Sequence, residues 1–394
     1  MSRILYAWEL GGNLGHVGSF APVAAELGRR GHDVLAAVRE TSACARVFGT
    51  AGRWLQAPFV AENLGQGSPI NYADMLLFNG YGDSERLLGL LVAWRQLIYL
   101  VRPDLIVADH APTAILAART LGISVMTYGS GFHYPPRVDP FPGMRPWQPF
   151  SEAALLEVNN RALATINGVL DRLGSAPLDR LSDLLHVAED GVLTLPELDH
   201  YPERGAARYW GLIPDSQQNK APVWPPGNGK RVFAYLRDGN PHALGTLEAL
   251  ARSGCSLIAF LPNPSLGHHL ASLPNVAISR EPLDMAHLAQ DADAAVLNGG
   301  MSSTAAFLLA GKPVLCVPNH LEQFLTGWNL TRMGAGLLVS PQDIAPGLSA
   351  VVTRLLEDSR LRSAAEAFAA KYVHLDQSSV VANLADRIDA LCAA

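Results

Sequence analysis

A histidine and an aspartate stand where a proton could be taken from a hydroxyl group. His16 ends the string GGNLGH, residues 11–16, between a predicted strand and the helix that follows it. Imidazole is the side chain whose ordinary pKa suits a general base near neutral pH. Asp109 ends the predicted strand PDLIVAD, where a carboxylate could orient the imidazole and stabilise its charged form. The alternatives are a packing or capping role for His16 and a helix N-cap for Asp109.

The glycines beside His16 let the backbone approach a ligand closely. Their spacing is not the GxGxxG of dinucleotide-binding turns, so a nicotinamide or flavin cofactor is not expected. We expect no cofactor at all, and no metal ion. No HExxH, GxxxxGK[ST] or G-x-S-x-G string occurs, and His268 and His269 lack a carboxylate at ligand spacing.

A second string of glycines and hydroxyls predicts an anion site. Residues 298–304, NGGMSST, follow a predicted strand and open a helix. Backbone N–H groups and the positive end of the helix dipole there suit a diphosphate. Arg237, after another strand, could add a charged contact. The alternatives are a tight turn with serine caps and a solvated arginine. The residues predicted to bind the diphosphate at this edge are Arg237, Asn298, Gly299, Gly300, Met301, Ser302 and Ser303.

A third polar string, PNHLEQ at residues 318–323, also follows a predicted strand. The carboxylate of Glu322 and the amide of Gln323 offer the mixed acceptors and donors that neighbouring sugar hydroxyls need. Ordinary polarity at a helix start is the alternative.

The elements that must position these residues alternate between short apolar runs and helical patterns, which is typical of βαβ units. Strands are expected in both halves, at 3–8, 33–38, 104–108, 124–128, 231–236, 256–261, 276–279, 294–297 and 313–317, with helices at 19–30, 111–121, 152–173, 243–253, 284–290, 302–310 and a helical tail at 342–393. Proline-rich stretches at 129–150 and 214–230 predict a shaped loop and a linker.

The predicted fold is therefore α/β, with two Rossmann-like doubly wound domains facing across a cleft. We expect an N-terminal domain at 1–213, a linker at 214–230, a C-terminal domain at 231–375, and a last helix at 376–394 that packs back on the first domain. Ligands of such sheets bind at the carboxyl ends of the strands.

Composition excludes several classes of protein. With 394 residues, 49% hydrophobic and 17% charged, the chain is globular rather than disordered. The net charge of −6 argues against a nucleic-acid partner. The four cysteines form no CxxC pair, and no apolar run is long enough to span a membrane, so a cytoplasmic protein is expected. Peripheral membrane contact and the oligomeric state stay open.

Taken together and in this order, the strings resemble the GT-B glycosyltransferases of the UDP-glycosyltransferase type, especially the bacterial macrolide and natural-product branch. The resemblance runs from GGNLGHVGSFAPVAAELGRRGHDV to the more specific NGGMSSTAAFLLAGKPVLCVPNHLEQFLTGWNLTRMGAGLLV. It implies that His16 is the catalytic base and Asp109 the acid that orients it. It also implies that the turn at 299–303 holds the diphosphate of a nucleotide-sugar donor, and that Glu322 and Gln323 read the sugar hydroxyls. The domain at 1–213 is then expected to bind the acceptor, and the domain at 231–375 the nucleotide sugar.

One residue predicted to bind the donor differs from the family pattern. The family usually has a histidine where this chain has Asn298, an amide that can donate a hydrogen bond but carries no charge. A binding protein without turnover is therefore one alternative function, and a nucleotide-sugar epimerase is another.

The predicted function is an inverting, metal-independent hexosyltransferase that moves a sugar from a nucleoside diphosphate to a hydroxyl of a largely apolar small molecule. Loops at 66–86 and 129–150 are expected to form the acceptor pocket. The residues predicted to contact the acceptor are Gly12, Phe78, Phe132 and His133.

Overall fold

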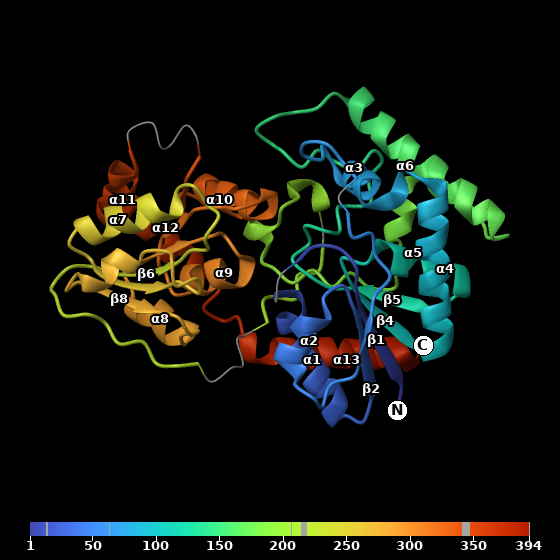
Figure 1. Ribbon diagram of the computed structural model, residues 1–394, viewed down its shortest axis with the longest axis horizontal. Helices are drawn as coiled ribbons and strands as arrows, with labels where there is room; N and C mark the ends of the chain where they lie inside the picture. Colours follow the sequence, from blue (N-terminus) through green and yellow to red (C-terminus); the bar gives the residue numbers. More distant parts are fainter. Residues whose placement is uncertain (13–14, 63, 206, 214–218, 341–346, 394) are drawn as a thin grey trace. The chain divides into compact units, whose positions relative to one another are not determined.

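The computed structural model of the protein describes residues 1–12, 15–62, 64–205, 207–213, 219–340 and 347–393. Residues 13–14 of the first glycine string, 214–218 of the predicted linker and 341–346 at the start of the predicted helical tail lie outside these ranges. The chain divides into two compact units (Figure 1). One comprises Met1–Leu195, Tyr201–Ile213 and Ser378–Ala394, and the other comprises Pro196–His200 and Pro214–Gln377.

The first unit is built on a parallel sheet of five strands in the order β3-β2-β1-β4-β5. The strands are β1 (Arg3–Trp8), β2 (Asp33–Val38), β3 (Trp54–Gln56), β4 (Leu105–Asp109) and β5 (Ser124–Thr127). Its helices are α1 (Gly15–Arg29), α2 (Thr41–Phe48), α3 (Tyr72–Leu76), α4 (Ser84–Val101), α5 (Pro112–Leu121), α6 (Glu152–Arg172) and α13 (Val380–Ala393). Helix α1 packs on the sheet because Val17, Phe20, Val23 and Leu27 recur on one of its faces.

The second unit is built on a parallel sheet of six strands in the order β11-β10-β9-β6-β7-β8. The strands are β6 (Arg231–Tyr235), β7 (Ser256–Phe260), β8 (Val276–Ser279), β9 (Ala294–Leu297), β10 (Val314–Cys316) and β11 (Gly336–Leu338). Its helices are α7 (Ala243–Arg252), α8 (Met285–Asp291), α9 (Met301–Leu309), α10 (Leu321–Met333), α11 (Leu348–Glu357) and α12 (Ser359–Lys371). The predicted doubly wound α/β architecture is confirmed in each unit.

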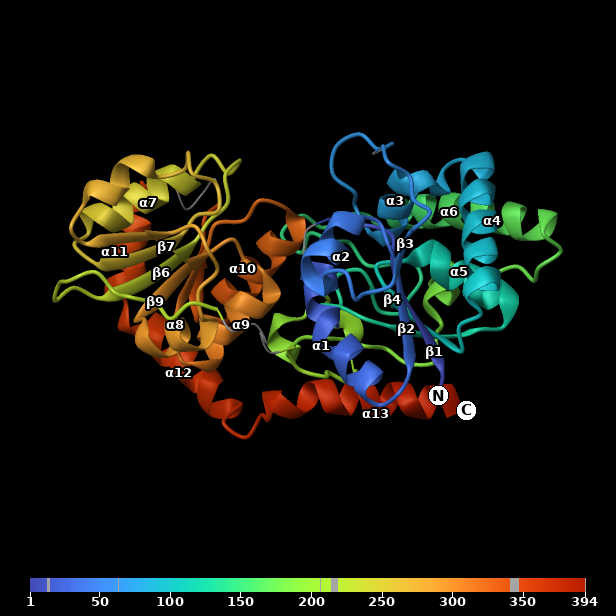
Figure 2. The ribbon, with the colours of Figure 1, turned by 60° about the horizontal axis from the view of Figure 1, so that its bottom comes forward.

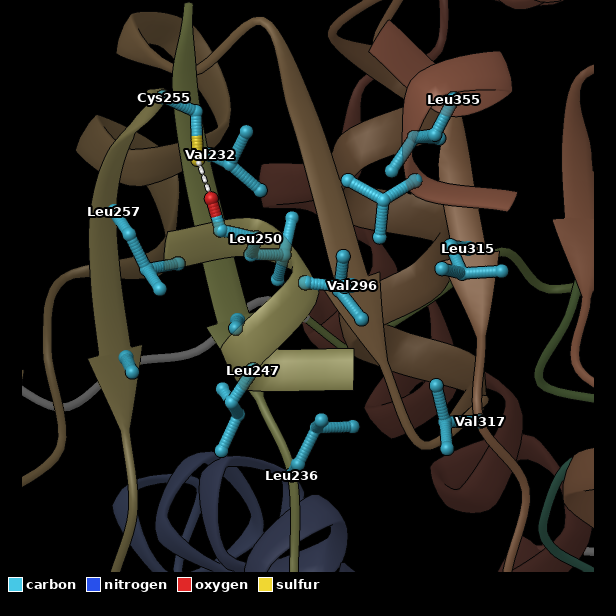
Figure 3. Packing of buried hydrophobic residues seen from close by; sticks show 14 of the residues in the cluster. Val232, Leu236, Leu247, Leu250, Cys255, Leu257, Val296, Leu315, Val317 and Leu355 are labelled. Atoms are coloured by element: carbon cyan, nitrogen blue, oxygen red, sulfur yellow. Dashed lines mark hydrogen bonds between the residues drawn. The ribbon is translucent and has the colours of Figure 1, made fainter. Parts of the chain in front are cut away.

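The core of the second unit shows why its strands read as continuous apolar runs in the sequence (Figure 3). Val232, Val296 and Leu315 come from neighbouring strands and are fully buried against Leu250 of α7. The thiol of Cys255 donates to the carbonyl of Leu250 at 3.3 Å. Since helices cover both faces of a parallel sheet, its strands carry apolar side chains on both sides.

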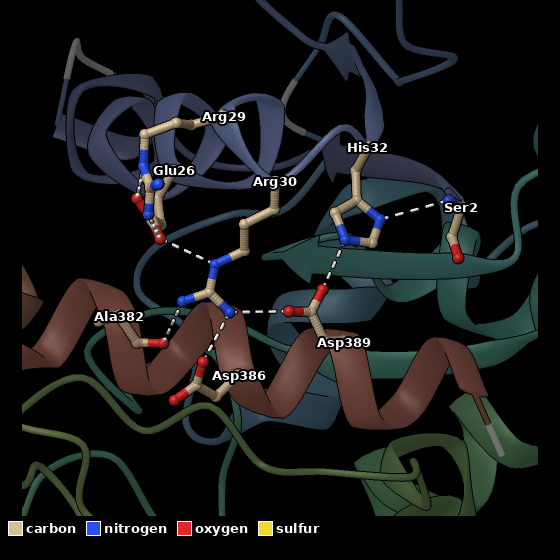
Figure 4. A network of polar contacts seen from close by, with 8 residues as sticks. All are labelled: Ser2, Glu26, Arg29, Arg30, His32, Ala382, Asp386 and Asp389. Atoms are coloured by element: carbon tan, nitrogen blue, oxygen red, sulfur yellow. Dashed lines mark hydrogen bonds and ion pairs between the residues drawn. The ribbon is translucent and has the colours of Figure 1, made fainter.

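The last helix of the chain, α13, packs along α1 of the first unit (Figure 2). Its buried residues Val380, Leu384, Ala385 and Ile388 share a core with α1. Arg30 adds ion pairs to Asp386 at 2.6 Å and Asp389 at 2.7 Å (Figure 4). Because these carboxylates are partly exposed, we ascribe most of the stabilisation to the apolar contact.

Two sequence predictions are wrong in detail. The predicted helical tail is not one stretch: α11 ends at Glu357, and the side chain of Asp358 accepts the N–H of Arg360 to begin α12. The region 66–86 is not a simple loop, because it contains α3 and the π-helical turn Leu77–Tyr81. Among the described residues, no helix is long and apolar enough to cross a membrane.

Candidate active site

The structure brings His16 and Asp109 into direct contact. His16 lies in the first turn of α1, and Asp109 is the last residue of β4, next to β1 in the sheet. The Nδ1 of His16 lies 2.9 Å from Oδ1 of Asp109, and the side chains are 16% and 3% exposed. A carboxylate facing Nδ1 favours the tautomer that carries its proton there, so that Nε2 becomes the basic nitrogen.

Gly11 is required beside this pair. Its φ is +86°, in the region that favours glycine, and a Cβ on it would lie 3.0 Å from Nε2 of His16. Gly12 is exposed, with open space where its Cβ would be. The sequence therefore places small residues where the backbone passes the basic nitrogen.

Two aromatic residues of β1 hold the pair, and the sequence analysis missed both. Trp8 stacks on the His16 ring, with ring centroids 4.8 Å apart and an interplanar angle of 19°. The hydroxyl of Tyr6 donates to Oδ2 of Asp109 at 2.7 Å. The sequence does show that Tyr6 and Trp8 are alternate residues of the strand that leads into the GGNLGH string. Alternate strand residues share a face, so both could have been expected on the same side of the sheet.

Asp109 does not cap α5, the alternative role that the sequence left open. Glu9 takes that place: one of its carboxylate oxygens accepts the N–H of Thr113 at 2.9 Å, and the other accepts the Thr113 hydroxyl at 2.5 Å. Burial raises the pKa of Glu9 to about 7, although the Thr113 hydrogen bonds oppose the shift. The carboxylate of Asp109 is thus committed to His16 and Tyr6.

Of the residues predicted to contact the acceptor, His133 lies next to His16, Phe132 packs on His133, and Phe78 packs elsewhere. The His133 ring lies 5.7 Å from that of His16, and the Phe132 ring lies edge-on to His133 at 5.1 Å. Phe78 packs on Gly65 instead, where a Cβ would lie 2.0 Å from the phenylalanine ring. His110, which the sequence analysis did not select, stacks on His133 at 3.7 Å, and its φ of +45° is unusual for a residue other than glycine.

The residues predicted to bind the donor gather at the carboxyl edge of the second sheet. Gly300 is the N-cap of α9, with Met301 and Ser302 in its first turn, and the hydroxyl of Ser303 donates to the Gly300 carbonyl at 3.1 Å. Backbone N–H groups at such a helix start are available to an anion.

Asn298 is fixed by the neighbouring strand end. Its Oδ1 accepts the backbone N–H of Arg237 at 3.0 Å, while the Arg237 side chain reaches the hydroxyl of Tyr235 at 3.2 Å. The amide nitrogen of Asn298 is buried and makes no hydrogen bond within the described part of the chain. The orientation leaves an uncharged N–H donor at position 298.

The two predicted sugar-reading residues begin α10. The Oε1 of Gln323 accepts the N–H of Asn319 at 2.8 Å, and Glu322 lies in the first turn. A Cβ on Gly299 would lie 2.7 Å from the carbonyl oxygen of Gln323. The turn before α9 is therefore packed against the first turn of α10 at Gly299.

Replacing Gly299 with alanine should disrupt this edge. Its φ of +92° is strained for alanine, and the Cβ would overlap the Gln323 backbone, which cannot move aside as a side chain can. We expect the free energy of unfolding to fall by about 2–4 kcal/mol and nucleoside diphosphate binding to weaken about tenfold or more. Chemical denaturation and a titration followed by thermal shift measure the two effects.

Gly254→Ala is the matched control. Gly254 has a similar φ of +77°, but no atom lies within 4 Å of its Cβ position. This variant should lose only the part of the free energy of unfolding that backbone strain causes, and it should keep its nucleotide affinity. Equal losses in the two variants would contradict the role assigned to the contact between the turns.

Comparisons with known proteins agree with this fold. Residues 245–385 match the family described as Erythromycin biosynthesis protein CIII-like, C-terminal domain. A PGL/p-HBAD biosynthesis glycosyltransferase of Mycobacterium tuberculosis is 27% identical over 302 residues, which cover 71% of this chain and 69% of the relative. The L-demethylnoviosyl transferase of Streptomyces niveus is 28% identical over 343 residues, 82% of each chain. The crystal structure of glycosyltransferase VinC in complex with dTDP has a TM-score of 0.68 at 16% identity, and covers 98% of this chain and 100% of that chain.

The chain is therefore a glycosyltransferase with the GT-B fold, similar to those that act on natural products. The resemblance noted in the sequence is confirmed. The roles of individual site residues, and the expected cleft between the domains, stay predictions.

Proposed function

We propose that this glycosyltransferase acts by one inverting displacement, without a metal ion, and that His16 is the base. Nε2 of His16 takes the proton of an acceptor hydroxyl while the oxygen attacks the anomeric carbon of the sugar from the face opposite the leaving diphosphate. Asp109 stabilises the imidazolium that forms. The contact of 2.9 Å between His16 and Asp109 carries this proposal.

The donor in this proposal is a nucleoside diphosphate hexose, with a deoxythymidine diphosphate the first to test. The backbone N–H groups around Gly300 and the dipole of α9 would stabilise the charge that the leaving diphosphate gains. The buried amide nitrogen of Asn298 would donate to a phosphate oxygen, and Arg237 would add positive charge. Glu322 and Gln323 would bind the sugar hydroxyls.

The acceptor in this proposal is a largely apolar small molecule with a free hydroxyl. We assign its binding to the domain at 1–213, where His133 lies beside His16 and Phe132 packs on His133, and donor binding to the domain at 231–375. A cytoplasmic location suits the four cysteines, none of which forms a disulfide.

A thermal-shift screen with dTDP, UDP, ADP and GDP tests the donor class. A ligand that binds the folded state at a hundred times its Kd stabilises it by about 2.7 kcal/mol. We expect dTDP to give the largest rise in Tm, because VinC was crystallised with dTDP. A rise with none of the four nucleotides would contradict the proposed donor site. Release of the diphosphate that depends on a hydroxylated acceptor then separates transfer from mere binding.

A further inference from the structure

The carboxylate of Asp109 is shared between two partners. Oδ1 faces Nδ1 of His16 at 2.9 Å, and Oδ2 accepts the hydroxyl of Tyr6 at 2.7 Å. Tyr6 is fully buried, and the side chain of Asp109 is 3% exposed. Because each oxygen has its own donor, the carboxylate cannot rotate without breaking a buried hydrogen bond.

The ring of Tyr6 also contacts the helix that carries His16. It stacks on Phe20 with ring centroids 4.1 Å apart and an interplanar angle of 10°, and Phe20 lies one turn after His16 in α1. Tyr128 lies edge-on to both rings, at 6.3 Å from Tyr6 and 5.5 Å from Phe20. Tyr6 therefore joins the strand end that holds the carboxylate to the helix that holds the imidazole.

Strand register explains why Tyr6 reaches the carboxylate. In the parallel pair of β1 and β4, Tyr6 lies opposite Val107 and Trp8 opposite Asp109. Tyr6 and Trp8 are alternate residues, so they project from the same face of β1. Trp8 covers the imidazole and Tyr6 binds the carboxylate, so side chains of one strand contact both His16 and Asp109.

We propose that Tyr6 is a positioning residue for the proton transfer, and that its hydroxyl draws negative charge from Asp109 and so limits how strongly Asp109 holds the proton on His16. This inference rests on the proposed function, in which His16 is the base. A hydrogen bond to a carboxylate stabilises its charged form and weakens its attraction for a neighbouring cation. Without the hydroxyl, His16 would bind its proton more tightly.

The groups around the pair leave Tyr6 as a neutral donor. Burial and the charge of Asp109 raise the pKa of Tyr6 well above its ordinary value, so the hydroxyl keeps its proton. Burial likewise raises the pKa of Tyr128 and Tyr134. Burial, with His16 and Arg39 nearby, lowers the pKa of His110 well below its usual range. The titratable groups that face the pair are thus Tyr6 of β1, His110 after β4, and Tyr128, His133 and Tyr134 after β5, and Arg39 after β2 acts on His110.

Tyr6→Phe tests the proposal because it keeps the ring and removes the hydroxyl. We expect kcat to fall about five- to twentyfold with the KM for the donor unchanged, and the acidic limb of the pH–rate profile to move upward by about 0.5–1 pH unit. The sign follows from the charge: an Asp109 carboxylate that lacks its Tyr6 donor raises the pKa of His16, so a higher pH is needed to free the base.

Tyr128→Phe is the control for a merely structural effect. Its hydroxyl is buried in the same aromatic cluster, but it donates to the carbonyl of Ser19 at 2.8 Å rather than to Asp109. Both variants should lose similar thermal stability, whereas only Tyr6→Phe should shift the pH profile. A profile of Tyr6→Phe that superimposes on the wild type, or an equal shift in Tyr128→Phe, would overturn the proposal.

His16→Ala, assayed in parallel, separates this proposal from the one on which it rests. If His16→Ala still transfers sugar at the wild-type rate, the proposed base is wrong. If His16→Ala is inactive while Tyr6→Phe behaves as the wild type at every pH, the proposed base stands and only the role of Tyr6 fails.

Discussion

Replacing His16 with alanine should lower the rate of sugar transfer about a thousandfold at saturating substrates. General base catalysis contributes on the order of 10²–10⁴ in rate, and the methyl group of alanine cannot accept a proton. Binding of the nucleoside diphosphate should stay close to normal, because the residues assigned to it belong to the other unit. Initial rates with a hydroxylated acceptor and a thermal-shift titration with dTDP measure the two quantities.

His287→Ala provides a matched control for the loss of a histidine that pairs with an aspartate. Its Nδ1 lies 2.9 Å from Oδ2 of Asp284, the same separation as in the His16 pair, but its side chain is 64% exposed on the second unit. This variant should transfer sugar at the wild-type rate. Activity of His16→Ala within tenfold of the wild type would exclude His16 as the base.

The sheets could be predicted from the sequence because buried parallel strands are short, apolar and separated by helical patterns. The expected ranges 276–279 and 294–297 match β8 and β9 residue for residue. Strand β3 was not predicted because it has only three residues, two of them exposed. A strand this short does not show the alternation of apolar and polar residues by which strands are recognised. The break between α11 and α12 was also not predicted, since it depends on how the side chain of Asp358 caps the second helix.

The proximity of His16 to Asp109 could be predicted although 93 positions separate them. His16 follows one strand of a parallel sheet and Asp109 ends another, and the carboxyl ends of such strands share an edge. The partners Tyr6 and Trp8 could not be predicted in the same way. A tyrosine or tryptophan inside a strand is ordinary core by composition, and only the register of β1 against β4 shows that Tyr6 reaches a carboxylate.

At Asn298, where the family usually has a histidine, the structure adds to what the sequence shows. The sequence indicates that a charge usual in the family is missing here. The structure adds that the N–H of Arg237 fixes the amide with its oxygen toward the backbone, which leaves the nitrogen as the group to meet a ligand. In the proposed donor site, a neutral N–H donor held in one orientation would lose little conformational entropy on contact with a phosphate oxygen.

Asp109→Asn should be nearly as damaging as the loss of His16, although it changes one oxygen to nitrogen and little else. The Tyr6 hydroxyl favours the orientation in which the asparagine oxygen occupies the place of Oδ2. The amide nitrogen then faces Nδ1 of His16 and donates to it. That forces the ring proton onto Nε2, so the nitrogen that should accept the acceptor's proton already carries one.

We therefore expect transfer by Asp109→Asn to fall by about 10³–10⁴, with substrate affinities and thermal stability close to those of the wild type. Asp109→Ala is the companion variant: it leaves the Tyr6 hydroxyl buried without an acceptor, so it should also lose stability, by about 1–3 kcal/mol. Rates, nucleotide titrations and thermal unfolding are measured on both variants. They separate the loss of rate that the wrong His16 tautomer causes from the loss of stability that the unpaired Tyr6 hydroxyl causes. If Asp109→Asn kept a rate within tenfold of the wild type, the carboxylate would be dispensable for proton transfer, and His16 would have to act as a base without help from its partner.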